Sequence, residues 1–135
     1  MKTLALCAIL KNEKHNLHQF LSSYQGCLDH VYLCDTGSTD GSIEWIKENA
    51  EAVVGCPVTL MHFPWVNDFA AARNHSISQV KEDYWMWSDL DDVLHGKEFF
   101  LEWKKSAMHL YEMWFNPYYY GFDDKGECKC KFVRE

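Results

Sequence analysis

The chain has 135 residues, 47% of them hydrophobic and 16% aromatic, which favours a single domain spanning residues 1–135 around one core. Its formal net charge of -7 comes without a block of basic residues, and this excludes nucleic acid as a partner because phosphate binding needs clustered Lys and Arg. No segment approaches the roughly 20 apolar residues of a membrane span, and the apolar start MKTLALCAIL lacks a small-residue cleavage site. We therefore expect a cytoplasmic protein without a membrane span.

Apolar runs alternate with amphipathic segments along the first two thirds of the chain. Residues 3–10 form a continuous apolar run, typical of a strand covered on both faces. From Asn16, apolar side chains recur every three or four positions, which predicts a helix. The pattern then predicts in turn strand 29–35, a helix from Ile43 capped by Asp40 or Ser42, strand 57–63, helix 67–80 and strand 84–88.

Strands that alternate with helices at this spacing predict an α/β fold with a mostly parallel, doubly wound (Rossmann-like) sheet and helices on both faces. Ligands of such sheets bind at the carboxyl ends of the strands. After this unit we expect a helix over residues 97–114 and a β-hairpin, with strands 118–122 and 128–133 around the turn residues 123–126.

Three carboxylates, Asp89, Asp91 and Asp92, follow the apolar strand 84–88. Alternate residues of a strand face the same side about 7 Å apart, so Asp89 and Asp91 can converge on one ligand. Two carboxylates drawn to ~4 Å repel by ~4 kcal/mol at an effective dielectric near 20, so a proton, a cation or open water must sustain the group. A hard divalent cation with oxygen ligands fits, and a solvated acidic turn is the alternative.

Other polar residues follow the earlier strands. Asp35 precedes Gly37 in CDTGSTDGS and could bond a base or a sugar, or its own turn. Arg73, among alanines in FAAARNH, suits a diphosphate, although a single Arg is more often a surface cation. Asn12 and Glu13 lie in KNE, which by itself is an ordinary loop.

Four motifs, AILKNE, CDTGSTDGS, WVNDFAAARN and WSDLDD, together resemble the inverting family 2 glycosyltransferases with a GT-A fold, over roughly residues 3–95. The resemblance implies metal-dependent transfer of the sugar of a UDP-sugar donor to an acceptor that the sequence does not identify. It implies that Asp89 lies near the ribose, that Asp91 holds Mn2+ or Mg2+ against the diphosphate, and that Asp35 contacts the uracil. Further donor-binding residues implied by the resemblance are Leu10, Asn12, Glu13, Arg73 and Leu90.

The chain departs from this family at its C-terminal side. Family members are normally longer and carry their acceptor site and general base after a hairpin like the one predicted here. We therefore expect a short or truncated donor-binding half that transfers weakly or hydrolyses its donor slowly. The carboxylates that the chain offers as a base match no family position; they are Asp92, Asp123, Asp124 and Glu127.

Two other functions compete with this one. A non-catalytic nucleotide-sugar-binding module would keep all four motifs. A haloacid-dehalogenase-type phosphatase would use Asp89 as a nucleophile, but it needs more sheet than the residues after Asp89 supply. The 6 cysteines are expected to be reduced thiols, Cys128 and Cys130 lack zinc-knuckle spacing, and the 7 histidines show no metal-ligand spacing. Homo-oligomerisation stays open.

Overall fold

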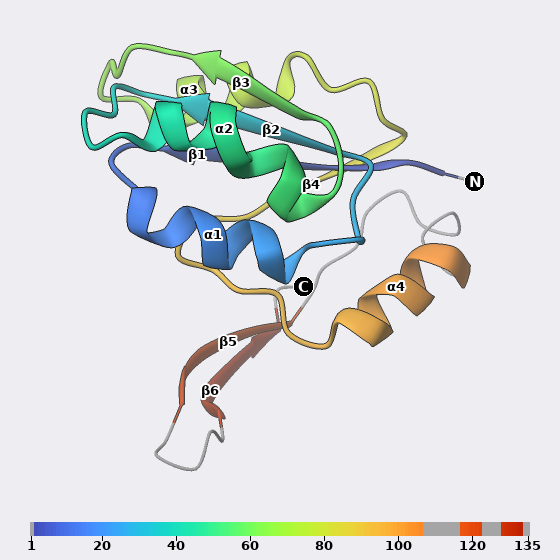
Figure 1. Ribbon diagram of the computed structural model, residues 1–135. Helices are drawn as coiled ribbons and strands as arrows, with labels where there is room; N and C mark the ends of the chain where they lie inside the picture. Colours follow the sequence, from blue (N-terminus) through green and yellow to red (C-terminus); the bar gives the residue numbers. More distant parts are fainter. Residues whose placement is uncertain (1, 107–116, 123–127, 134–135) are drawn as a thin grey trace.

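The computed structural model describes residues 2–106, 117–122 and 128–133. Its main body is a parallel sheet with the strand order β3-β2-β1-β4 (Figure 1). The strands are β1 (Leu4–Leu10), β2 (His30–Asp35), β3 (Val58–His62) and β4 (Tyr84–Trp87). The predicted order of strands and helices is confirmed, because each apolar run of the sequence forms one strand of this sheet.

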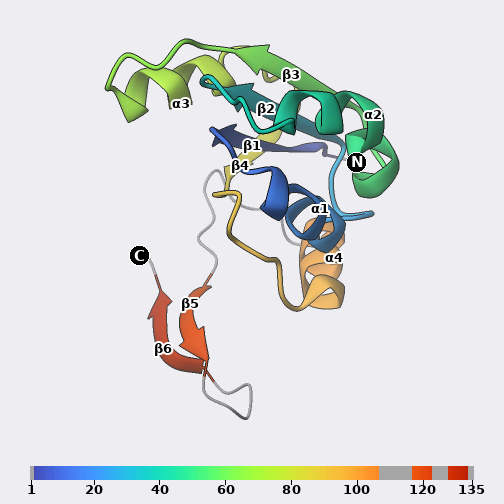
Figure 2. The ribbon, with the colours of Figure 1, turned by 60° about the vertical axis from the view of Figure 1, so that its left-hand side comes forward.

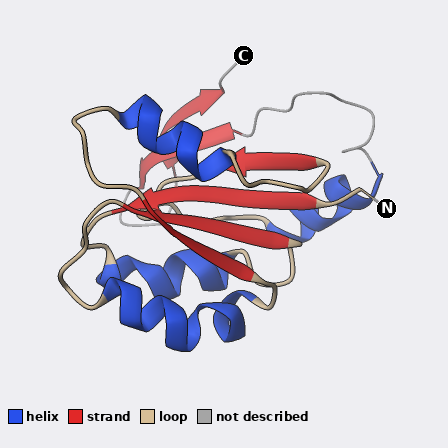
Figure 3. Ribbon diagram, turned by 90° about the horizontal axis from the view of Figure 1, so that it is seen from above, coloured by secondary structure: helices blue, strands red, loops and turns tan. Residues whose placement is uncertain are grey.

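Helices cover both faces of the sheet, as the doubly wound pattern predicts (Figure 3). The helices are α1 (Lys14–Ser23), α2 (Ser42–Val54), α3 (Phe69–Ile77) and α4 (Lys97–Ser106). Leu6 of β1 faces the cluster that contains Phe20 of α1, whereas Cys7 faces the opposite cluster, against which Ile77 of α3 packs. Alternate residues of one strand thus build two separate cores, which explains why β1 is apolar throughout.

Helix α4 extends the first of these cores beyond the sheet. Figure 2 shows α4 beside α1, and Phe100 of α4 belongs to the same buried cluster as Phe20. Lys104 donates to the backbone carbonyl of Cys27 at 2.9 Å and forms a 2.7 Å ion pair with Asp29. The buried ring of Phe100 therefore attaches α4 to the core, and Lys104 attaches it to the segment that leads into β2.

The hairpin forms a second, two-stranded antiparallel sheet from β5 (Pro117–Phe122) and β6 (Cys128–Val133). Both predicted strands are thereby confirmed. The predicted turn 123–126 and the second half of the predicted helix 97–114, from residue 107 on, lie outside the described residues.

Some boundaries differ from those that the sequence predicts. Helix α1 begins at Lys14 rather than Asn16, because Glu13 occupies the cap position and its carbonyl accepts the Asn16 N–H at 2.9 Å. The cap position of α2 is Gly41, with φ 88°, and Asp40 instead accepts the backbone N–H of Ser42 at 3.0 Å. A left-handed backbone at this position suits glycine, so the predicted cap by Asp40 or Ser42 is wrong.

Helix α3 is shorter than the predicted segment 67–80. The Asp68 carboxylate accepts the N–H of Ala71 at 3.1 Å and caps the helix, which ends at Ile77 with Ser78 at the C-cap. None of the helices that the structure describes combines the length and the hydropathy that a bilayer crossing needs.

The cysteines whose side chains the structure describes are Cys7, Cys27, Cys34 and Cys56, and all four are free thiols. Their reduced state stays a prediction. Burial, followed by the charge of Glu82, raises the pKa of Cys7 to about 12.

Candidate functional site

The carboxyl ends of β1, β2 and β4 form the edge at which the polar motifs meet. The chain passes from β1 through β2 to β3 by way of α1 and α2 on one face, and returns to β4 through α3 on the other. Strand order therefore reverses between β1 and β4. In open α/β sheets this switch point is where ligands bind.

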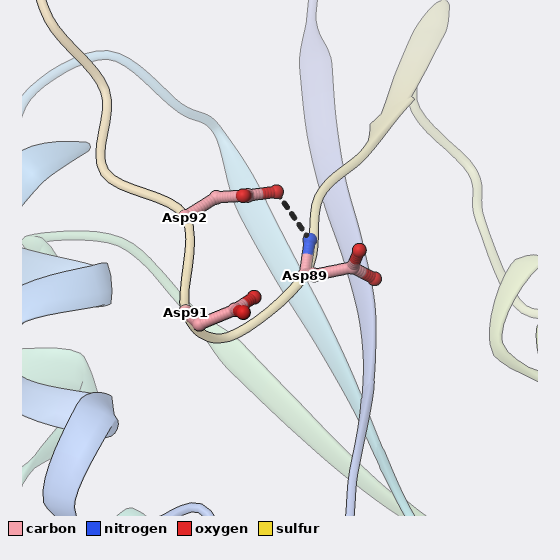
Figure 4. A group of neighbouring side chains, drawn as sticks. All are labelled: Asp89, Asp91 and Asp92. Atoms are coloured by element: carbon pink, nitrogen blue, oxygen red, sulfur yellow. Dashed lines mark hydrogen bonds between the residues drawn. The ribbon is translucent and has the colours of Figure 1, made fainter. Parts of the chain in front are cut away.

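The three aspartates after β4 lie on a tight turn (Figure 4). The backbone N–H of Asp92 donates to the carbonyl of Asp89 at 3.0 Å, and one carboxylate oxygen from each of Asp89, Asp91 and Asp92 lies within 4.8 Å of the others. Carboxylate oxygens are the ligands that Mg2+ and other hard cations prefer, so the donor set fits a divalent metal.

The route by which these carboxylates converge differs from the predicted one. Strand β4 ends at Trp87, so Asp89 and Asp91 do not alternate along a strand. The turn brings them together instead, because Leu90 at its tip is buried in the core with only 4% of its surface exposed. The predicted convergence is present, but the strand geometry used to derive it was wrong.

Asp89 is an exposed residue, but its carboxyl group is partly desolvated and lies beside two further carboxylates. Burial, then the charges of Asp92 and Asp91, raise the pKa of the Asp89 carboxyl, while a hydrogen bond with the Trp87 side chain and the charge of Arg73 act in the opposite direction. A bound cation would relieve this repulsion.

Arg73 lies on α3 next to the end of β4. Its guanidinium carbon lies 4.4 Å from the centroid of the Trp87 ring, which is a cation–π contact. The contact holds an exposed guanidinium near the acidic turn, so the structure brings together Arg73 and Asp89, which are far apart in the sequence.

Asp35 ends β2 and is 3% exposed. Its carboxylate accepts the backbone N–H groups of Gly37 at 3.0 Å and Ser38 at 3.2 Å, and it lies 3.9 Å from the Nδ1 of His62 on β3. The local turn bonding that the sequence offered as an alternative is therefore present. His62 shows no metal-ligand spacing in the sequence, but the parallel register pairs it with Asp35.

The loops after β1 and β2 are joined by hydrogen bonds. The carbonyl of Leu10 accepts the Thr36 N–H at 3.0 Å, and the Asn12 side chain accepts the Thr39 N–H at 2.7 Å. The N–H of Asn12, a residue with φ 55°, donates to the Ser38 hydroxyl at 2.9 Å. The two motifs that contain these residues thus form one continuous wall of the site, for which the small polar residues of CDTGSTDGS are the sequence signal.

The remaining candidates differ in what they can offer a ligand. Glu13 accepts the side-chain amide of Asn16 at 2.7 Å at the start of α1. Leu10 and Leu90 are almost fully buried, and the Leu10 carbonyl already accepts hydrogen bonds from the N–H and the hydroxyl of Thr36.

The candidates form two groups along this edge. One surrounds the end of β2 and contains Asp35 and Asn12, and the other surrounds the end of β4 and contains Arg73, Asp89 and Asp91. Strand β1 lies between β2 and β4, so two strand spacings, or roughly 10 Å, separate the strand ends that carry Asp35 and Asp89. A ligand that contacts both strand ends would have to be elongated.

Comparison with known proteins identifies a family. The model of "Glycosyl transferase family 2" matches residues 6–103, a segment that contains all four motifs. A TPR repeat-containing protein of Synechococcus elongatus is 31% identical over 94 residues, which are 70% of this chain and 22% of that protein. The match sets aside the haloacid-dehalogenase-type alternative, since the acidic turn lies inside the matched segment.

Solved structures share the fold. TarS 1-349 of S. aureus superposes with a TM-score of 0.61 and 18% identity, covering 79% of this chain and 31% of that one. A structure of the same protein in complex with UDP matches with 17% identity and the same TM-score of 0.61. The mannosyltransferase PcManGT from Pyrobaculum calidifontis, in complex with GDP-Man and Mn2+, gives a TM-score of 0.66 at 18% identity, covering 79% of this chain and 32% of that one.

These relatives are much longer than the matched region. The chain spans 22% of the Synechococcus protein and about a third of each of these solved structures. The α/β sheet is GT-A-like, and at these identities the structural likeness speaks for the fold alone.

Proposed function

The chain belongs to glycosyl transferase family 2, and on that premise we propose that residues 1–135 act as one domain that binds a nucleotide-sugar donor and transfers its sugar. The observation that carries the proposal is the convergence of three carboxylates within 4.8 Å at the end of β4, beside the switch point of the sheet. A nucleoside diphosphate is elongated and anionic, and a divalent cation lets acidic residues hold it.

In this proposal the residues at the carboxyl edge of the sheet bind different parts of the donor. Asp35 contacts the base, and Leu10, Asn12 and Glu13 line the nucleotide pocket. Arg73 offers its fork to the diphosphate. Asp89 lies near the ribose and Asp91 holds Mn2+ or Mg2+. The UDP of the TarS complex supports uracil as the base, and PcManGT, in complex with GDP-Man and Mn2+, makes guanine the second candidate.

The chemistry we propose is an inverting transfer. An acceptor hydroxyl attacks the anomeric carbon from the side opposite to the departing diphosphate, so negative charge must be neutralised and one proton removed. A bound divalent cation would stabilise the charge of the leaving diphosphate. Arg73 contributes to the same task from α3.

Proton removal has no assigned residue. Asp92 is engaged in the turn, and Asp123, Asp124 and Glu127 lie outside the described residues. We therefore propose that this chain by itself hydrolyses a UDP-sugar slowly, with water in place of the acceptor.

Calorimetric titration of UDP, GDP and CDP, each with and without Mn2+, tests the binding proposal. We expect UDP to bind most tightly and only with the metal. Affinity for UDP that is the same in EDTA and in Mn2+ would overturn the metal-bridged site. Binding without any release of UDP from a donor would instead support a non-catalytic nucleotide-sugar-binding module.

A further inference from the structure

A chain of hydrogen bonds connects the end of α1 to the acidic turn. The hydroxyl of Tyr24 donates to the Ser88 hydroxyl oxygen at 3.2 Å, and the Ser88 hydroxyl donates to Asp92 Oδ2 at 3.3 Å. The same oxygen of Asp92 accepts the backbone N–H of Asp89 at 3.0 Å. Each hydroxyl thus donates toward the carboxylate, an arrangement in which successive hydrogen bonds strengthen one another.

The core holds the two hydroxyl groups of this hydrogen-bonded series in place. Tyr24 is 4% exposed and packs edge-on against Phe20, with ring centroids 5.5 Å apart, and Ser88 is 6% exposed. A buried hydroxyl that lacks a hydrogen bond destabilises the fold. The hydroxyls of Tyr24 and Ser88 therefore favour the one orientation of the Asp92 carboxylate that accepts the Ser88 hydrogen bond. The position of Asp92 is therefore set by residues deep in the protein.

The three carboxylates of the turn differ in their hydrogen bonds. One oxygen of Asp92 already accepts bonds from a hydroxyl and from an N–H group. Asp89 and Asp91 are more exposed than Asp92. In Figure 4 the side chains of Asp92 and Asp91 extend toward Asp89, whereas the Asp89 carboxylate points away from the turn. Leu90, buried between them, fixes the tip of the turn from the other side.

We propose that Asp92 is a positioning residue, not a metal ligand: together with Ser88 and Tyr24 it clamps the Asp89 backbone, so that the carboxylates of Asp89 and Asp91 are presented to the cation. This inference rests on the proposed function for its metal and assigns a role that the family motif leaves open. It predicts that the hydrogen-bond acceptor at position 92 matters and that its charge does not.

The decisive comparison is between Asp92→Asn, which keeps an oxygen acceptor but removes the charge, and Asp92→Ala, which removes both. Mn2+ affinity is measured in the presence of UDP from the electron paramagnetic resonance signal of free Mn2+. We expect Asp92→Asn to stay within about threefold of the parent and Asp92→Ala to bind at least tenfold more weakly, a pattern that a charged ligand would not give. Asp91→Asn is the reference for loss of a ligand.

Tyr24→Phe removes the first donor of the hydrogen-bonded series Tyr24–Ser88–Asp92. Tyr32→Phe is its matched control. Tyr32 is equally buried at 3% exposure, but its hydroxyl donates to Glu82 at 3.0 Å and takes no part in the turn. Both variants lose one buried hydroxyl, so both lower thermal stability. Only Tyr24→Phe should weaken Mn2+ binding, by about two- to fivefold.

Two outcomes overturn the clamp: Asp92→Asn that loses Mn2+ as severely as Asp91→Asn, which makes Asp92 a ligand, or Asp92→Ala that binds Mn2+ like the parent. If the parent itself binds no Mn2+ in the presence of UDP, the metal part of the proposed function fails. The positioning of Asp89 by Asp92 is then tested on metal-free protein. There, hydrogen exchange of the Asp89 amide, followed by NMR, should be slow in the parent and Asp92→Asn and fast in Asp92→Ala. Equal exchange in all three would overturn the clamp independently.

Discussion

Asp89 and Asp92 are joined by two hydrogen bonds that run in opposite directions. The N–H of Asp92 donates to the carbonyl of Asp89 at 3.0 Å, and the N–H of Asp89 donates to the carboxylate of Asp92, also at 3.0 Å. The pair closes the turn and holds the carboxylates of Asp89, Asp91 and Asp92 close together. The predictions below test what this arrangement serves.

Asp91→Asn should abolish the metal dependence of UDP binding and the slow release of UDP from UDP-sugars. An amide is a weaker ligand for a hard cation than a carboxylate, so UDP affinity in Mn2+ should fall at least about tenfold. Asp91 is exposed, and its replacement should change the free energy of unfolding by no more than about 0.5 kcal/mol.

The assay for Asp91→Asn is UDP release over hours from UDP-glucose, UDP-galactose and UDP-N-acetylglucosamine, with and without candidate acceptors. Glu98→Gln, which removes one exposed charge on α4, is the control for net charge. Metal-stimulated release that persists in Asp91→Asn would contradict the assignment. Fast turnover by the parent would show a general base that the sequence did not reveal.

Asp35→Ala should weaken binding of the nucleoside while the response to Mn2+ remains. Loss of one hydrogen bond to a charged group costs about 1.5–3 kcal/mol. Because Asp35 also bonds the N–H groups of Gly37 and Ser38, Asp35→Asn is needed beside it, since the amide keeps an acceptor for the turn. Titration of uridine and UDP against both variants checks this, and parent-like affinities for both ligands would exclude a nucleoside contact.

Arg73→Ala should weaken UDP binding much more than uridine binding. The guanidinium fork can bond two phosphate oxygens at once, whereas Lys offers a point charge, so Arg73→Lys should recover only part of the affinity. Lys47→Ala on α2 removes another exposed cation and serves as the control. A uridine affinity that falls as much as the UDP affinity would place Arg73 at the nucleoside instead.

The ion pair between Asp29 and Lys104 should make the attachment of α4 sensitive to acid. Burial raises the pKa of Asp29, but the hydrogen bonds from Lys104 and the Leu4 N–H and the charge of Lys104 outweigh it, so the pKa lies below its ordinary value of 3.8. A lowered pKa in the folded state stabilises the fold above the ordinary value, and this contribution is lost as the pH falls through the folded pKa.

Urea unfolding of the parent and of Asp29→Asn between pH 2.5 and 6 measures this contribution. Because 40% of the Asp29 side chain is exposed, solvent screening limits the difference in unfolding free energy to about 1 kcal/mol near pH 6. The difference should shrink toward zero as the pH falls below 3.8. A difference that stays constant down to pH 2.5 would show that the charge of Asp29 does not stabilise α4.

Local pattern was enough to place the helices and strands of the described residues. The continuous apolar run of β1 required two covered faces, and the two core clusters on either side of Leu6 and Cys7 are those faces. The rule that parallel sheets bind ligands at the carboxyl ends of their strands then placed Asp35, Asn12 and Asp89 on one edge without knowledge of any contact. These conclusions depend on periodicity and on connection geometry, which neighbouring residues encode.

What the sequence alone determined, then, is the α/β class, the order of the strands along the chain and the edge that carries the motifs. The tertiary structure decided how the site is assembled: the turn at Leu90 that gathers the carboxylates, the Trp87 ring that holds Arg73, and the buried hydroxyls of Tyr24 and Ser88 that orient Asp92. Tyr24 and Asp92 lie 68 positions apart (92 minus 24), and no local pattern links them. Such contacts exist only because burial forces distant polar groups to satisfy one another, and the packed core alone determines which groups meet.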